Sequence, residues 1–190
     1  MPAILSPVRL RELDRPSLEK HFMTLEGEDR RLRFGSSISN HGLRAYVARL
    51  DFERDGLFAV QDEDLCLLAV VHVAATGLSA ELGLSVLPGF RDKGLGNALF
   101  TRAVTFLRNR GTLEVFVHCL SENGAMMHLA RKNGMRIVYS GGESDARLKL
   151  DPPTANSFIN EWLGDQEAHA VQAVRRHARI SQLLFRAIVP

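Results

Sequence analysis

Hydrophobic positions change their spacing along the chain, and these changes predict the order of helices and strands. Apolar and polar residues alternate over 8–13, which indicates a short strand. Apolar residues then recur every three or four positions over 18–25, and again from Ser39 or Asn40 to Leu50. This spacing is typical of amphipathic helices, and both Ser39 and Asn40 are good N-caps for the second one.

Strands dominate after residue 56. Dense apolar and valine content predicts strands over 57–60 and 65–75, joined as a hairpin through an acidic segment. A third strand is expected over 79–87 and ends at Pro88-Gly89. A helix over 94–110, closed by Gly111, and a buried strand over 113–119 are expected next. A shorter helix over 125–132 and a pair of strands over 135–140 and 146–150 follow.

The alternation of strands and helices over 79–135 implies crossover connections around a mixed central sheet flanked by helices. The predicted fold class is therefore α/β or α+β, with one domain over 1–150. From residue 151 the pattern changes to one or two helices, 154–163 and 166–188, which predict a C-terminal helical extension over 151–190. The sequence leaves three alternatives open for this tail: it packs on the domain, it contributes to a homodimer, or it remains free.

Composition narrows the class of protein. The 190 residues are 45% hydrophobic, enough for a single buried core. A net charge of +2 is too small to favour nucleic acid as a partner. Cys66 and Cys119 form no CxxC motif, and histidines show no metal-ligand spacing, so we expect no metal site and a reducing cytoplasm. The N-terminus resembles no signal peptide, and the longest apolar run, 65–75, is too short to span a membrane.

The stretch 84–96 is the most informative, because a buried strand, a proline break and a glycine-rich turn lead directly into a helix. Free N–H groups at a helix N-terminus attract anions, and glycine lets a phosphate approach closely. Arg91 and Lys93 add positive charge. A tight turn that needs glycine for its own geometry is the alternative. Leu99 stands where a Rossmann fingerprint needs its third glycine, and the P-loop pattern is missing.

The same stretch, with its core Arg91-Asp92-Lys93-Gly94-Leu95-Gly96, resembles motif A of the GNAT superfamily of acyl-CoA N-acyltransferases, whose core is [QR]xxGxG. The segment 123–135 is similar to the family's second motif, in which an asparagine after a strand starts a helix. The resemblance covers about residues 5–150. Within the superfamily, 25–35 is similar to bacterial members related to the acetyltransferase domain of protein-lysine acetyltransferases.

The resemblance implies the GNAT fold and acetyl-CoA as co-substrate. It places the pyrophosphate on the main chain of the turn, the pantetheine arm along the preceding strand, and an asparagine beside the arm. The residues assigned in this way are, in that order, Arg91, Asp92, Lys93, Gly94, Leu95 and Gly96; Leu84, Ser85 and Val86; and Asn123. An edge exposed where two strands splay apart suits pantetheine, which carries two amides. For Asn123 an ordinary helix N-cap is the alternative.

Acyl transfer to an amine needs an unprotonated nitrogen, so the chemistry requires a base that removes an ammonium proton. Glu81 is the first candidate, because it begins the motif A strand at a position similar to the base glutamate of protein-lysine acetylating members. Its neighbours Leu82 and Leu84 are expected to desolvate it. His118 is the second, because another GNAT branch carries its base on that later strand. The structural alternatives are a solvent-facing glutamate and a hydrogen-bonded core histidine.

Ala130 departs from the family pattern, which usually has a tyrosine there to protonate the departing thiolate. A thiol with a pKa near 8.5 can leave without full protonation, and water, Ser121 and Cys119 are the available substitutes. We therefore predict acetyl transfer from acetyl-CoA to a primary amine, on a protein lysine or a small molecule. The alternative is a non-catalytic acyl-CoA-binding regulatory module.

Arg30, Arg31 and Arg33 lie in the polar stretch 27–35, which is expected to be a connection beside the path of the acceptor. If they line the entrance, they favour an acceptor with a carboxylate or another negative group. Alternatively, they anchor the stretch by pairing with nearby acidic residues.

Overall fold

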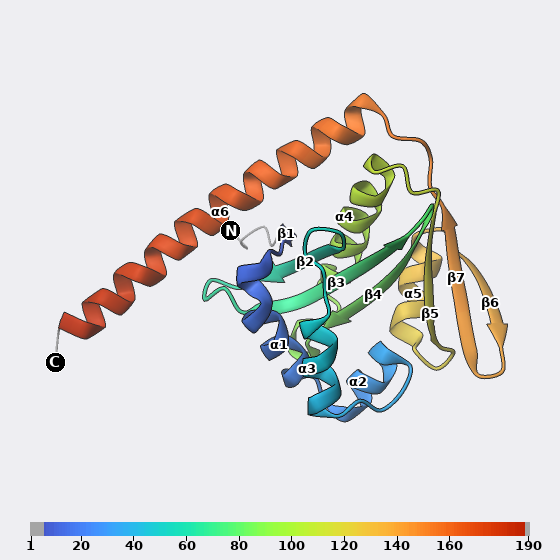
Figure 1. The fold of residues 1–190 in the computed structure, drawn as a ribbon, viewed down its shortest axis with the longest axis horizontal. Helices are drawn as coiled ribbons and strands as arrows, with labels where there is room; N and C mark the ends of the chain where they lie inside the picture. Colours follow the sequence, from blue (N-terminus) through green and yellow to red (C-terminus); the bar gives the residue numbers. More distant parts are fainter. Residues whose placement is uncertain (1–5, 189–190) are drawn as a thin grey trace.

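Seven strands form one mixed sheet in the order β1-β2-β3-β4-β5-β7-β6 (Figure 1). The computed structural model describes residues 6–188, and for residue 169 and residues 175–188 it describes the main chain only. The strands are β1 Val8–Arg9, β2 Gly56–Gln61, β3 Leu67–Thr76, β4 Ser79–Val86, β5 Glu114–Leu120, β6 Arg136–Ser140 and β7 Glu143–Lys149. Neighbouring strands are antiparallel except β4 and β5, which are parallel. The predicted mixed sheet is confirmed.

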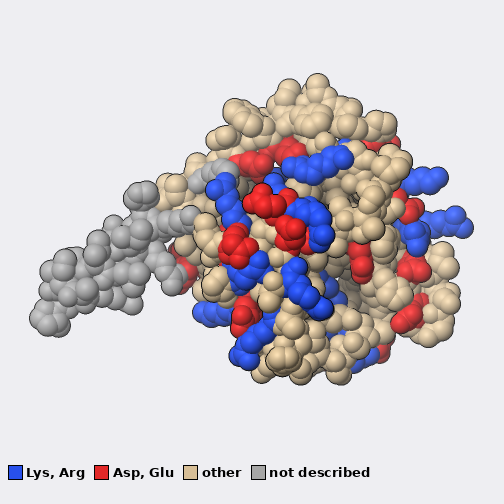
Figure 2. Space-filling view, viewed as in Figure 1, with Lys and Arg blue, Asp and Glu red and all other residues tan. Residues whose placement is uncertain are grey.

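Helices cover both faces of the sheet. They are α1 Arg15–Thr24, α2 Gly27–Phe34, α3 Asn40–Ala48, α4 Leu95–Asn109, α5 Gly124–Lys132 and α6 Ala155–Ile188. Alternation along β2 supplies one core to each face. Leu57 and Ala59 pack with α1 and α3, whereas Phe58 and Val60 pack in the cluster that contains α4 and α5. Basic and acidic side chains are interspersed on the face drawn in Figure 2, in keeping with the nearly balanced charge.

Two predictions near the N-terminus were wrong. Residues 27–35 are not a connection but helix α2, which ends at Gly35 in the left-handed region (φ 75°). None of its side chains is fully buried, so it has no clear apolar stripe, and it is stabilised by acidic residues in its first turn and basic ones in its last. The strand expected over 8–13 ends at Arg9, and a 3₁₀ turn over Glu12–Asp14 follows.

The tail is one continuous helix rather than two. Its first half packs on α4, where Arg102 forms ion pairs with Glu161 and Asp165, and further along Ala168 is buried in the α1 and α3 core. The end of α6 then extends past the body of the molecule (Figure 1). Apolar side chains on α6 that are more than half exposed are Phe158, Ile159, Trp162, Leu163 and Val174. None of the described helices is long and apolar enough to cross a bilayer.

Candidate active site

The two parallel strands, β4 and β5, are paired only over the first residues of β4 and then separate. β4 pairs with β5 only from Ser79 to Glu81, opposite Glu114–Phe116. Beyond Glu81 no pairing joins the two strands in the described chain, so Leu82–Val86 presents a free main-chain edge toward β5. This is the splayed edge that the sequence analysis expected, and its N–H and C=O groups are available to a ligand that carries amides.

The turn between β4 and α4 has the main-chain shape of an anion site. Asp92 (φ 58°) and Gly94 (φ 78°) both adopt left-handed conformations, and α4 begins directly afterwards at Leu95. Such alternation turns successive N–H groups toward one side, next to the positive end of a helix dipole. A side chain at Gly96 would lie 3.6 Å from Leu84, so this glycine borders the space above β4. The anion-site interpretation therefore fits the geometry.

A groove of about 410 Å³ runs along this edge and turn. Nine of the ten predicted cofactor-binding residues line it: Leu84, Ser85, Val86, Arg91, Asp92, Gly94, Leu95, Gly96 and Asn123. The exception is Lys93, whose ammonium donates to the Gly89 carbonyl at 3.0 Å and lies over the Phe90 ring. The side chain of Arg91 pairs with Asp29 of α2 at 2.5 Å.

A second cavity, of about 260 Å³, lies beside the groove. We call the first space the cofactor groove and the second the acceptor cavity. Residues of α2, α3, β3, β4 and β5 line the acceptor cavity, among them Glu81 and His118. The residues that line both spaces are Leu32, Arg33, Leu84, Asn123 and Met126. The two spaces therefore meet where β4 leaves β5.

A family model described as the acetyltransferase (GNAT) family matches residues 28–135, which is more than half of the chain. The chain belongs to this family. The predicted GNAT fold and the prediction of a GNAT-family N-acetyltransferase are thereby confirmed, and motif A is the strand and turn of the cofactor groove.

Solved structures share the GNAT fold at low sequence identity. The GNAT domain of S. lividans PAT has a TM-score of 0.65 at 18% identity, over 76% of this chain and 89% of that one. Spermidine N-acetyltransferase from Vibrio cholerae, in complex with CoA and spermine, gives 0.59 at 16%, over 76% and 95%. PaiA N-acetyltransferase from Thermoplasma acidophilum, in complex with coenzyme A, gives 0.58 at 16%, over 76% and 98%.

Asn123 has two structural partners in this GNAT domain. Its side-chain oxygen accepts from the Met126 N–H at 3.0 Å and so caps α5, as the structural alternative expected. Its amide nitrogen donates to the Leu32 carbonyl at 3.2 Å. Asn123 thus ties α5 to α2 at the junction of the two spaces.

Glu81 lines the acceptor cavity at the last position where β4 pairs with β5. Its side chain is exposed, so the desolvation expected from its neighbours does not occur. The reason is strand alternation: Leu82 points to the opposite face, where it is buried in the α4 core. Glu81 is thus an exposed carboxylate that borders the cavity.

His118 also lines the acceptor cavity, and it is not a core histidine, because 47% of its side chain is exposed. Nδ1 lies 2.8 Å from Asp145 and Nε2 lies 3.5 Å from Glu143. The hydrogen bond that the ring donates to Asp145 raises the pKa of His118, so the ring holds its proton to higher pH. A protonated ring between two carboxylates is a poor proton acceptor.

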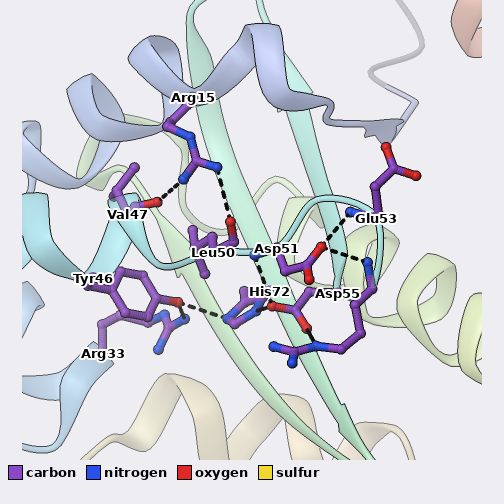
Figure 3. A network of polar contacts seen from close by, with 10 residues as sticks. Arg15, Arg33, Tyr46, Val47, Leu50, Asp51, Glu53, Asp55 and His72 are labelled. Atoms are coloured by element: carbon purple, nitrogen blue, oxygen red, sulfur yellow. Dashed lines mark hydrogen bonds and ion pairs between the residues drawn. The ribbon is translucent and has the colours of Figure 1, made fainter.

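One buried and one partly buried histidine lie near the site, and neither belongs to a sequence motif. His21 of α1 donates from Nδ1 to the Leu67 carbonyl, and its Nε2 accepts from the Ser85 hydroxyl, both at 2.8 Å. Burial lowers the pKa of His21 to about 4, so the ring is neutral at pH 7. His72 lies between Tyr46 and Asp55 in the network of Figure 3. Their partners are 17 to 64 residues away in sequence, which hides them from pattern analysis.

The groups that could replace the missing tyrosine as a proton donor are buried or already hydrogen-bonded. Ala130 is fully buried in the α4 and α5 core. Cys119 borders the acceptor cavity, and burial raises the pKa of its thiol to about 11. The hydroxyl of Ser121 is engaged with that of Ser144 at 2.8 Å.

Proposed function

We propose that this GNAT protein transfers an acetyl group from acetyl-CoA to a primary amine by direct attack. The observation that carries the proposal is the meeting of the two spaces at the β4–β5 splay. One space offers a free strand edge and an anion-binding turn, and the other offers a carboxylate. An amine in the acceptor cavity would face a thioester held at the free edge, as direct reaction between two bound groups requires.

For acetyl-CoA we propose two kinds of main-chain contact. The N–H groups of 91–96 would hold the pyrophosphate, and the edge formed by Leu84, Ser85 and Val86 would pair with the pantetheine amides. The left-handed turn, the bare Gly96 and the unpaired edge fit both groups. The complexes of two GNAT neighbours with CoA support the same cofactor.

For the base we propose Glu81, with His118 as the second candidate. Glu81 is a carboxylate without an ion-pair partner among the described residues, and it borders the acceptor cavity. An exposed carboxylate can take the ammonium proton directly or through water. His118 borders the same cavity but is already held by Asp145 and Glu143.

The acceptor is proposed to be a protein lysine or a small-molecule amine. We also propose that residues 1–150 form the GNAT domain and 151–190 the extension, and that the protein works in the cytoplasm of a bacterium. A homodimer, if formed through the tail, would cover the exposed apolar side chains of α6 between Phe158 and Leu163.

Ala130 favours a second candidate function, that of a non-catalytic acyl-CoA-binding regulatory module. Without the tyrosine of the family pattern, the groove retains its means of binding acetyl-CoA, whereas the thiolate loses its usual proton donor.

Calorimetry with acetyl-CoA, followed in the same sample by a thiol assay for CoA after addition of amines and lysine peptides, tests the proposal. We expect binding and amine-dependent release of CoA. Binding without release would support the regulatory module, and absence of binding would contradict both functions.

A further inference from the structure

The three neighbouring arginines of α2 have different surroundings. Arg30 donates to two main-chain carbonyls at the end of α1. Arg31 forms ion pairs with Glu28 and Glu122. Both therefore anchor α2, which is one of the alternatives that the sequence left open. Arg33 differs, because no carboxylate among the described residues pairs with it, and it lines both the cofactor groove and the acceptor cavity.

Arg33 lies over the point where β4 has left β5. Its guanidinium occupies the space that a side chain at Gly83 would fill. Gly83 is two residues past the last paired position of β4 and one before Leu84, so the guanidinium lies above the junction of the two spaces. The Nε–H of Arg33 is buried and has no hydrogen-bond partner among the described residues. A buried donor without an acceptor is unfavourable unless a ligand supplies one.

A chain of hydrogen bonds holds this guanidinium in place (Figure 3). Arg33 Nη2 donates to the Tyr46 hydroxyl at 3.3 Å, and that hydroxyl lies 2.9 Å from His72 Nδ1. His72 Nε2 lies 3.2 Å from the carboxylate of Asp55, which is 4% exposed and also pairs with Arg54. Because an ionised carboxylate only accepts, Nε2 carries the ring proton and Nδ1 accepts from Tyr46.

Within this chain of hydrogen bonds, Arg33 is the charged group at the end that faces the cavity. Burial, and next the charge of Arg33, lower the pKa of His72, so the ring is neutral at pH 7. The Tyr46 hydroxyl donates its hydrogen bond to Nδ1 of His72, and its oxygen accepts from Arg33. Tyr46, His72 and Asp55 are positioning residues, because they act on the site through the guanidinium.

We propose that Arg33 is a catalytic residue that stabilises the negative charge formed on the thioester during acetyl transfer. The inference rests on the proposed function. The amine nitrogen attacks the carbonyl carbon, and the π pair of the C=O bond moves to oxygen. As the C=O bond re-forms, the C–S bond breaks and its pair leaves on sulfur. Glu81 takes the ammonium proton before the attack, and the second proton of the nitrogen passes to water as the amide forms. Both the oxyanion and the thiolate are anions that appear at the junction over which Arg33 lies.

This role accounts for the absence of the usual acid at Ala130. A fixed cation beside a departing thiolate stabilises it without donating a proton, and it requires no reorganisation at the moment of reaction. The loss of one such donor typically lowers kcat about 10²- to 10³-fold. A chain that uses Arg33 in this way does not need the tyrosine.

The test compares Arg33→Ala with Arg31→Ala, an arginine variant on the same helix outside both spaces. We expect kcat for CoA release to fall about 10²-fold in Arg33→Ala, with the acetyl-CoA dissociation constant changed only a few-fold. Millimolar guanidinium chloride should restore part of the lost kcat in Arg33→Ala, because the free cation can occupy the vacated space. Arg31→Ala should retain its activity and show no such activation.

Arg33→Lys and Tyr46→Phe keep the test informative if Arg33→Ala unfolds, which circular dichroism would reveal. Lysine retains the charge without the planar fork, so kcat should lie between wild type and Arg33→Ala. Tyr46→Phe removes only the hydroxyl that holds Arg33 and should lower kcat with little change in KM. Tyr139→Phe, at the exposed second tyrosine of the chain, is its matched control.

Two results would overturn the role of Arg33 while leaving the proposed function intact. One is an unchanged kcat in folded Arg33→Ala beside an active wild type. The other is a KM of Arg33→Ala that is raised for an acceptor peptide with a free carboxylate but not for the same peptide with that carboxylate amidated. This result would make Arg33 an acceptor-binding group. An inactive wild type that binds acetyl-CoA would overturn the proposed function and this inference together.

Discussion

The cofactor groove and the acceptor cavity meet at one splay but are built differently. The groove is made of main chain: a free strand edge, a left-handed turn and the start of α4, all within residues 84–96. The acceptor cavity is made of side chains from α2, α3, β3, β4 and β5. In the proposed reaction, main-chain groups would bind what every CoA thioester shares, whereas side chains would decide which amine enters and how its proton leaves. Variants on the two sides should therefore affect different kinetic constants.

The largest effect is expected on the acceptor side, from Glu81→Gln. Loss of the proposed base should lower kcat by about 10²- to 10⁴-fold, since that is the usual contribution of general base catalysis. The acetyl-CoA dissociation constant, measured by calorimetry, should stay the same. His118→Gln is the matched variant on β5. If His118→Gln loses activity and Glu81→Gln does not, the base lies on the other strand.

A comparable loss, but of binding, is expected on the cofactor side from Gly96→Trp. An indole there would fill the groove above Leu84, and such overpacking costs roughly 3 kcal/mol, or about 10²-fold in affinity for acetyl-CoA. Gly94→Asp should also weaken binding, because it adds a negative charge to the anion site at φ 78°. Gly111→Asp is its control, with similar backbone strain (φ 75°) at the opposite end of α4. Equal affinity in folded Gly94→Asp and Gly111→Asp would contradict the anion site.

Acid should weaken the anchoring of β4 through His21. With a pKa of about 4 when folded and about 6.5 when unfolded, His21 binds a proton more readily in the unfolded chain. Its contribution to the free energy of unfolding is therefore complete above pH 6.5 and declines by up to roughly 3 kcal/mol as the pH falls to 4. Urea unfolding across this range should give a shallower decline for His21→Gln than for wild type. His41→Gln, at an exposed histidine, is the control and should match wild type. The same pH dependence of the free energy of unfolding in wild type and His21→Gln would contradict the role of His21.

The smallest effect is expected from Asp29→Asn, at the rim of the cofactor groove. Asp29 holds the Arg91 side chain at 2.5 Å, and Arg91 is 44% exposed. Asp29 itself is only 13% exposed, and a partly exposed pair of this kind is worth on the order of 1 kcal/mol, so release of Arg91 toward the phosphates should tighten acetyl-CoA binding a few-fold. Weaker binding in the calorimeter would mean that Asp29 positions Arg91 for the cofactor.

The same contrast explains which parts of the site could be predicted from sequence. The groove depends on neighbouring residues, since a strand, a proline break and glycines such as Gly94 act locally, and nine of ten assigned residues line it. Lys93 is the exception, because its side chain folds back onto the Gly89 carbonyl instead of lining the groove. Helix α2 was missed because it buries no complete stripe. The hydrogen bond between Tyr46 and His72 and those of His21 join segments 26 to 64 residues apart, and no local pattern records them.

The most direct test of the account is the rate of CoA release at an acetyl-CoA concentration near the wild-type dissociation constant, with and without amine, for wild type and Gly96→Trp. We predict release that rises and saturates with amine concentration in wild type and is largely lost in Gly96→Trp. Release that is independent of amine, or equal in the two proteins, would contradict transfer between the cofactor groove and the acceptor cavity.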